Sequence, residues 1–526
     1  MRDRETLKKT VIKYGLLAGM LVVFCVTRMW QLVRFPAGLH IDEAGLAYDA
    51  WCLAEYGVDR YLKSWPLYFV NKGDGSSVFG AYLCVGLFKI FGYDPWLLRF
   101  SAVLFSLVNL IYGIKIARKV SPESSGMPFV TGALIVICPY FIMAGRFTYD
   151  CNFMLGMSTL FLYNLLRAIE SDKISRYVIA GISGGLVLYT YALSYMILPL
   201  FLILTLLYLF RVKKFYFKGC LAMAIPLGIL AFPLILVQVV NLFDLEEFRL
   251  GIFTVTKLPN YRASDVGRVR WENILQCICT IFLGDLDPKY DLEYNTAPGF
   301  VNLYMVTVVF FAIGLGNVLK HFVCDIKKRQ FAAFDMILLW FVGMLFFEFH
   351  IETNVNRVNG IFFVTILLAA RGIFVFLDVV RKRMRMWMWA IAIGCIYLCC
   401  FLRFAVYYYG GDYLEDTTYI TPLFDTTVED AVWFIEQDEV LRLKTTQMAE
   451  YKIYFALGTT LPPQILDFGD HEMDGKFQNY LFGTLSSIED GCIYIVRDGF
   501  DVYCAELRAA GFEEQRFQGY SLYYKK

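Results

Sequence analysis

The sequence is poor in charged residues and carries almost no net charge. Charged residues make up 18% of its 526 residues, and the formal net charge is +1. A near-neutral chain has no bulk attraction to nucleic acid or to acidic polymers, so we expect no nucleic-acid partner. Partners must instead be inferred from individual sites.

Metal and disulfide motifs are absent as well. The chain has 14 cysteines, but none forms a CxxC pair or has the Cys–His spacing of a zinc site. Most lie in apolar runs, where free Cys packs as a small hydrophobe. We therefore expect no metal site and no disulfide framework. In the polar tail, Cys492 and Cys504 are either one disulfide or two free thiols, and the sequence leaves both open.

Nucleotide-binding motifs and internal repeats are also missing. Neither GxxxxGK[ST] nor a GxGxxG between a strand and a helix occurs, which excludes chemistry driven by ATP or a dinucleotide. Repeats with broken helices are typical of secondary transporters. Their absence weighs against a transporter or a lipid flippase, which stays the alternative class.

What the chain has is apolar sequence. Hydrophobic residues make up 58% of the chain and the mean hydropathy is +0.52, values typical of a polytopic membrane protein. A membrane span needs roughly 20 apolar residues. No cleavage site follows the first apolar run, so we expect a retained helix there. We expect eleven spans: 14–33, 96–117, 128–144, 151–168, 177–193, 195–210, 220–240, 301–319, 335–350, 361–380 and 387–405.

Two shorter apolar stretches, 78–91 and 271–283, are better read as interfacial helices. With that count, Lys and Arg gather in alternate loops on one side, as the positive-inside rule requires of the cytoplasm. We therefore expect a cytoplasmic N-terminus and an extracytoplasmic C-terminus in a cell membrane. The basic loops are 1–13, 118–127, 169–176, 211–219, 320–335 and 381–386.

The tail changes character. DTTVEDAVWFIEQ and TTQMAEYKIYFAL have helical periodicity, whereas CIYIVRD and YSLYYK look like strands. The fold class that follows is an all-α polytopic membrane domain, 1–405, with a small extracytoplasmic α/β domain, 406–526. Residues 34–95 form the first outer loop, and we expect the tail to do no chemistry itself.

The first outer loop carries an acidic pair in HIDEAGLAYDAW. Apolar residues recur at helical spacing after it and Gly57 follows, so Asp42 and Glu43 lie at the start of a helix along the membrane. Helix capping by Asp42 is the structural explanation. The functional one makes Asp42 a general base, with Glu43 beside it as a helper.

Two further outer elements carry polar side chains. GRFTYD brings Arg146 and a second acid, Asp150, to the same surface, although a capped turn explains it as well. The loop GDLDPKYDLEYNTAPGF is rich in acids, and for this loop we favour a simple solvated surface.

The segment HIETNVNRVNG places Arg357 among Asn354, Asn356 and Asn359 before the tenth span. Arginine offers a fork of donors suited to phosphate, and asparagine adds neutral hydrogen bonds. Snorkelling at a helix end is the alternative. Arg371, deeper in the same span, needs a partner or access to the cytoplasmic interface.

These residues fit one kind of chemistry. A carboxylate removes a proton from an acceptor and a cation holds a phosphate leaving group, at a surface that nucleotides do not reach. The substrate must then arrive already activated. A sugar on a polyprenyl phosphate satisfies this requirement, because its lipid tail diffuses in the bilayer.

The order of these motifs resembles a known family. A first helix followed by an outer DE pair, then FGYDPWLLRFSA, CPYFIMAGRFTYD and NVNRVNG, is similar to the C-type membrane glycosyltransferases. Specifically, it resembles the protein O-mannosyltransferase and aminoarabinose transferase group of glycosyltransferase family 39. The resemblance covers roughly residues 10 to 405.

The resemblance implies an inverting hexosyl- or pentosyltransferase that uses a polyprenyl-phosphate sugar donor. It assigns the catalytic acid to Asp42, with Glu43 beside it, a second acidic site to Asp150, and the carrier phosphate to Arg357. The chain lacks the lumenal β-trefoil domain of the eukaryotic mannosyltransferases, so an envelope glycan, lipid or protein acceptor in bacteria is favoured. Whether a divalent cation assists is left open.

Overall fold

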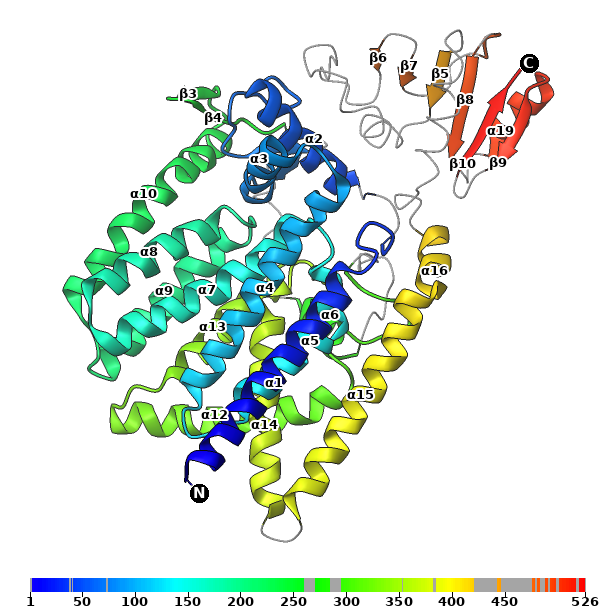
Figure 1. Ribbon diagram of the computed structural model, residues 1–526. Helices are drawn as coiled ribbons and strands as arrows, with labels where there is room; N and C mark the ends of the chain where they lie inside the picture. The colour runs from blue at the N-terminus through cyan, green and yellow to red at the C-terminus, as the bar shows by residue number, and fades with distance from the viewer. Residues whose placement is uncertain are drawn as a thin grey trace. The chain divides into compact units, whose positions relative to one another are not determined.

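The computed structural model describes most of the chain as helices, with a small sheet near the C-terminus (Figure 1). The protein divides into two units. The first comprises Met1–Trp30, Ala102–Gln238 and Arg262–Tyr407, and the second Gln31–Ser101, Val239–Tyr261 and Tyr408–Lys526. The structure describes residues 2–36, 39, 41–71, 74–259, 270–283, 295–351, 353–381, 385–420, 442–445, 475–477, 480–482, 488–490, 492–497, 501–516 and 520–525.

The first unit is built from helices. They are α1 (Arg2–Met29), most of α4 (Pro95–Val120), α5 (Met127–Ile137), α6 (Pro139–Ala144), α7 (Asp150–Ser171), α8 (Ile174–Leu188), α9 (Ser194–Arg211), most of α10 (Phe217–Leu242), α11 (Trp271–Phe282), α12 (Val306–Lys328), α13 (Ala333–Glu348), α14 (Asn359–Arg381) and most of α15 (Met386–Gly410).

Seven of the described helices are long and apolar enough to cross a membrane, namely α1, α4, α9, α10, α12, α14 and α15. The other four expected spans also coincide with helices: α5 with α6, α7, α8 and α13. The chain is thus a multi-pass membrane protein. The expected interfacial stretches form α11 and α3 (Phe79–Phe91), and their position at the interface stays a prediction.

One expected span is interrupted. The sequence predicts a single helix over 128–144, but the backbone leaves the helix at Cys138, where ψ is 139°, and α6 begins at Pro139. Proline disfavours helical geometry in the residue before it and has no N–H to donate. The break lies a few residues before the GRFTYD turn.

The tightest helix crossing in the first unit joins α12 and α14. A Cβ atom on Gly314 would lie 1.9 Å from the backbone oxygen of Leu368, and one on Gly372 would lie 1.8 Å from that of Phe310. Only glycine allows two backbones this close. Small residues at helix crossings are typical of membrane bundles.

Arg371 has partners on the same helix bundle. Its guanidinium contacts the carboxylate of Glu123 at 3.1 Å and the side-chain oxygen of Asn317 at 3.1 Å. Glu123 lies in the expected cytoplasmic loop before α5. The cost of placing an arginine in an apolar helix is thus reduced by an ion pair.

The second unit contains α2 (Ile41–Tyr56), α3 and two hairpins. Strand β1 (Phe69–Asn71) pairs with β2 (Asp74–Ser76), and β3 (Phe248–Leu250) pairs with β4 (Phe253–Val255), both antiparallel. Backbone hydrogen bonds from Leu67 to Thr254 and from Thr254 to Trp65, 2.9 and 3.3 Å long, join the first outer loop to β4. These two loops, distant in sequence, therefore form one layer.

The C-terminal part has helix α16 (Asp412–Ile420) and a mixed sheet in the order β6-β7-β5-β8-β10-β9. Its strands are β5 (Arg442–Thr445), β6 (Gly475–Phe477), β7 (Tyr480–Phe482), β8 (Cys492–Arg497), β9 (Glu513–Arg516) and β10 (Tyr520–Tyr524), and α19 (Asp501–Ala509) packs with them.

Two expected strands are confirmed as β8 and β10, and the α/β character of the tail is confirmed with them. The two expected tail helices lie almost wholly outside the described residues. Cys504 is a free, buried thiol. The alternative of a disulfide involves Cys492, whose side chain lies outside the described part of the structure. The expected domain boundary after residue 405 stays a prediction.

Candidate active site

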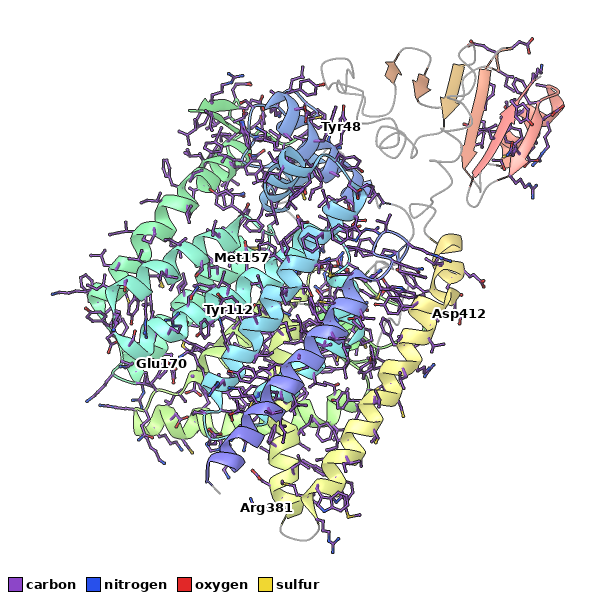
Figure 2. The ribbon with its side chains drawn as sticks, viewed as in Figure 1. Tyr48, Tyr112, Met157, Glu170, Arg381 and Asp412 are labelled. Carbon is purple, nitrogen blue, oxygen red and sulfur yellow. The ribbon has the colours of Figure 1, made fainter. Side chains whose placement is uncertain are left out.

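Helix α2 positions the acidic pair. Its apolar residues repeat at helical spacing, and Ala47, Ala50 and Tyr48 are buried. Figure 2 labels Tyr48 on this helix. Asp42 and Glu43 both lie in its first turn, as expected, where a negative charge is favoured by the helix dipole. The helix ends before Gly57, whose φ of +73° suits glycine.

The two acids have different surroundings. Glu43 is fully buried and paired with Arg99 of α4, with Nη2 2.9 Å from Oε2 and Nε 3.3 Å from Oε1. Asp42 is only partly buried. The ion pair holds the Glu43 carboxylate in place, and the partial exposure of Asp42 leaves that residue accessible to solvent.

Arg99 also organises the chain before α2. Its Nη1 donates to the backbone oxygens of Leu32, Val33 and Pro36, at 3.0, 3.1 and 2.7 Å. One buried side chain thereby joins the segment after α1, the start of α2 and α4. Asp42 immediately precedes Glu43 in the first turn of α2, so the pairing of Glu43 with Arg99 holds the turn that carries Asp42.

A second buried ion pair supports the other side of α2. Arg60 forms a two-point contact with Asp49, at 2.9 and 2.8 Å, and its guanidinium lies where a Cβ on Gly45 would be. The neighbouring Asp59 accepts hydrogen bonds from the backbone of Tyr61 and Lys63. Burial and the charge of Asp49 raise the pKa of Asp59 to about 7.

The GRFTYD turn lies in the first unit, and its arginine caps a helix. Arg146 is fully buried, and its two terminal nitrogens donate to the backbone oxygens of Thr27 and Trp30, both at 2.9 Å. These oxygens belong to the C-terminal end of α1, which lacks intrahelical donors. The contacts of Arg146 are therefore those of a structural cap, and a role in the reaction stays a prediction.

Asp150 begins α7 and is partly buried. Two residues further along α7, the side chain of Asn152 donates to the backbone oxygen of Phe147 at 3.1 Å, and this hydrogen bond closes the GRFTYD turn. Asn295 then donates to both Asn152, at 3.2 Å, and Asn356. A buried amide chain thus joins the GRFTYD turn to the NVNRVNG segment.

The NVNRVNG segment is shaped by its asparagines. The side-chain oxygen of Asn354 accepts the backbone N–H groups of Asn356 and Arg357, at 3.1 and 3.0 Å, which forms a tight turn. Asn359 donates to the backbone oxygen of Cys151 at the start of α7. Asn354 and Asn356 therefore make structural contacts that present Arg357.

Arg357 and Asp150 belong to one electrostatic cluster. The hydroxyl of Tyr191, between α8 and α9, interacts with the charges of Asp150, Arg357 and Glu348. Glu348 ends α13 and is fully buried. The cluster combines a cation, two acids and a phenol within the first unit.

The structure thus groups the expected residues within two units. Asp42 and Glu43 belong to the second unit, and Asp150, Arg146, Asn354, Asn356 and Arg357 belong to the first. The acidic part of the loop GDLDPKYDLEYNTAPGF lies outside the described residues. Within the described part of the chain, no group of three or more His, Cys, Asp or Glu side chains is arranged to hold a metal.

Three functional candidates were missed in the sequence. Arg99 and Glu348 each carry a charge in a largely apolar helix, and this pattern alone marks a residue that needs a partner. Tyr191 has no comparable signal, because tyrosine is common at the ends of membrane helices.

Comparison with known proteins supports the resemblance. Residues 76–241 match the model of the family described as dolichyl-phosphate-mannose-protein mannosyltransferase. No curated protein matches. The fold is similar to the crystal structure of ArnT from Cupriavidus metallidurans in the apo state, with a TM-score of 0.59, 13% identity and 98% of each chain covered.

A second structure of the same protein, bound to undecaprenyl phosphate, matches with a TM-score of 0.57, 14% identity and 98% coverage of both chains. These matches confirm the resemblance to the protein O-mannosyltransferase and aminoarabinose transferase group that the sequence indicates. They also confirm the C-type glycosyltransferase fold for this multi-pass membrane protein.

Proposed function

We propose that the protein transfers a sugar from a polyprenyl-phosphate carrier to an extracytoplasmic acceptor, with inversion at the anomeric carbon. The observation that carries the proposal is the similarity of fold along almost the whole chain to a protein solved with undecaprenyl phosphate bound. The family match over 76–241 supports the same class of donor.

In this proposal Asp42 is the general base. Asp42 is partly buried and lies next to Glu43, which the ion pair with Arg99 holds in place. A carboxylate in this setting removes the proton of an acceptor hydroxyl as that oxygen attacks the anomeric carbon. Attack from the face opposite the phosphate produces inversion.

Arg357 neutralises the charge that grows on the departing phosphate. Its backbone is held in the Asn354 turn, and its guanidinium provides two parallel donors suited to phosphate oxygens. The sugar is a hexose or a pentose, and the acceptor is a glycan, lipid or protein of the cell envelope. We place the acceptor, the first outer loop and the C-terminal sheet on the extracytoplasmic side.

Mass spectrometry of cells with and without the gene tests the proposal. Cells that lack the protein should lose one modified envelope component and accumulate a polyprenyl-phosphate sugar. Cells that carry Asp42→Asn should match the deletion, whereas Glu55→Gln, an exposed acid on the same helix, should match the wild type. Identical lipid-linked sugars and envelope glycans in all four strains would reject a transferase.

A further inference from the structure

Glu348 differs from the other buried acids of the protein. It ends α13, its side chain is 0% exposed, and neither carboxylate oxygen has a hydrogen-bond partner among the described residues. Burying a carboxylate without hydrogen-bond donors is strongly unfavourable. Such a residue needs a donor that the described residues do not supply.

Glu43 provides the comparison within the same chain. That acid is equally buried, but its two oxygens are both occupied by the fork of Arg99. A glutamate that serves only to hold helices together has contacts of this kind. Within the part of the chain that the structure describes, Glu348 has no contacts of this kind, so a purely structural role does not explain its burial.

The neighbours of Glu348 indicate which ligand would supply the donors. The positive charge of Arg357 acts on its carboxylate, and both charges act on the hydroxyl of Tyr191. Cys277 of α11, also buried, interacts electrostatically with Glu348. Glu348 therefore lies within electrostatic range of Arg357, the residue that we assign to the donor phosphate.

We infer that the Glu348 carboxylate recognises the donor sugar by accepting hydrogen bonds from its ring hydroxyls. This inference rests on the proposed function. The phosphate on the anomeric carbon and the hydroxyls are substituents of the same sugar ring, and Arg357 and Glu348 are within electrostatic range of each other. The two carboxylate oxygens, which have no hydrogen-bond partner among the described residues, match a pair of neighbouring hydroxyls.

Recognition by a buried carboxylate discriminates between sugars, because a sugar without the matching hydroxyls leaves the carboxylate oxygens without hydrogen bonds. A buried group built to bind a hydroxyl strongly rejects an analogue that lacks it, because the group is then left unpaired. Glu348 should thus contribute to the choice of sugar, whereas Arg357 contributes to binding of every carrier phosphate.

The test compares lipid binding by the full-length protein in nanodiscs. The probes are undecaprenyl phosphate without sugar, and undecaprenyl-phosphate hexose and pentose. For the preferred sugar donor, Glu348→Gln should weaken binding at least tenfold while binding of undecaprenyl phosphate stays within about twofold. Arg357→Ala should weaken both, and Glu272→Gln, an exposed acid on α11, should change neither.

The wild-type protein gives a second measurement that needs no variant. Donors that lack single ring hydroxyls should bind at least tenfold more weakly at one or two positions, and Glu348→Gln should no longer distinguish them. Equal losses for both lipids in Glu348→Gln, or no loss at any deoxy position, would overturn the sugar-binding role alone. Failure of the wild type to bind any of the lipids would overturn the proposed function with it.

Discussion

At the scale of single residues, two adjacent acids of α2 are expected to behave differently. Glu43 is tied to Arg99 in a fully buried pair, whereas Asp42 is partly buried. Breaking a buried pair by removing one partner costs about 3 to 5 kcal/mol. Loss of Glu43 should therefore appear first as loss of stability, and loss of Asp42 as loss of chemistry.

The first prediction is that Asp42→Asn lowers turnover by roughly a hundredfold or more, with donor binding and melting temperature unchanged. Asparagine caps a helix about as well as aspartate, so the variant removes the base and keeps the fold. Initial rates with a lipid-linked sugar, measured beside binding, check this. Glu43→Gln should instead lower the melting temperature. Near wild-type turnover in Asp42→Asn would exclude it as the base.

The second prediction concerns Arg357. Replacement by Ala should strongly reduce use of the donor, and replacement by Lys should restore it only in part, because a point charge cannot reproduce the two-point contact with phosphate. Rates and donor affinity are the measurement. Arg381→Ala, at the other, exposed end of α14 (Figure 2), is the matched control. Full activity of Arg357→Ala would reject the phosphate-binding role and assign this residue to snorkelling at the membrane surface.

Sequence alone placed some of these residues well. The helical spacing of α2 put Asp42 and Glu43 in its first turn, because local periodicity determines a helix start. The pairing of Glu43 with Arg99 could not be predicted from the sequence, because the two residues are 56 positions apart and pairing at that separation depends on tertiary structure. Arg146 was assigned to a surface site because its contact with the end of α1 leaves no local pattern.

At the scale of elements, spans are predicted by length and apolarity, and every expected span coincides with a helix or helix pair. The exception inside one of them is instructive. Pro139 was visible in the sequence, but a proline is tolerated at a helix start as well as at a break. Only the backbone of Cys138 shows that it divides α5 from α6.

The third prediction concerns the crossing of α12 and α14. Gly372→Ala should destabilise the helix bundle by about 1 to 3 kcal/mol or more, because the new methyl group would overlap the backbone of the opposing helix. Thermal unfolding in detergent measures it. Gly316→Ala on α12 is the control, since a Cβ there meets nothing within 4 Å. Equal melting temperatures for the two variants would contradict the close approach.

The fourth prediction concerns acid stability of the C-terminal sheet. Hydrogen bonds from the Arg508 guanidinium, at 2.8 and 3.0 Å, lower the pKa of Glu514 to about 2. An unfolded glutamate has a pKa of about 4.3. The contribution is therefore present above about pH 4.3 and is lost as the pH falls toward 2.

Hydrogen exchange of residues 492–524 at pH 6 and pH 3 gives the readout. Protection should fall with acid in the wild type, and Glu514→Gln should be less protected at pH 6 and change less between the two conditions. Glu513→Gln, an exposed neighbour, should follow the wild type. Unchanged protection at pH 6 in Glu514→Gln would refute the assignment.

At the scale of the whole molecule, the distribution of basic loops predicts the orientation in the membrane. The fifth prediction is that reporters fused at Lys119, in the last turn of α4, and after Lys526 give opposite signals, cytoplasmic for the first and extracytoplasmic for the second. A phosphatase and fluorescent-protein pair at each position measures this. Matching signals at both positions would reject the eleven-span topology.

The cap that Arg146 forms on the end of α1 also limits how much the length of this helix can vary, because a second arginine ties α1 to α5. Arg28, inside α1, donates to the backbone oxygens of Ile135 and Val136 at the end of α5, and Arg146 holds the end of α1 in return. One residue inserted into α1 would turn everything beyond it by about 100° and shift it by about 1.5 Å. The donors of Arg28 and Arg146 would then no longer reach their backbone acceptors. Homologous chains should therefore tolerate insertions in their loops, whereas the length of α1 near the Arg28 and Arg146 contacts should stay constant.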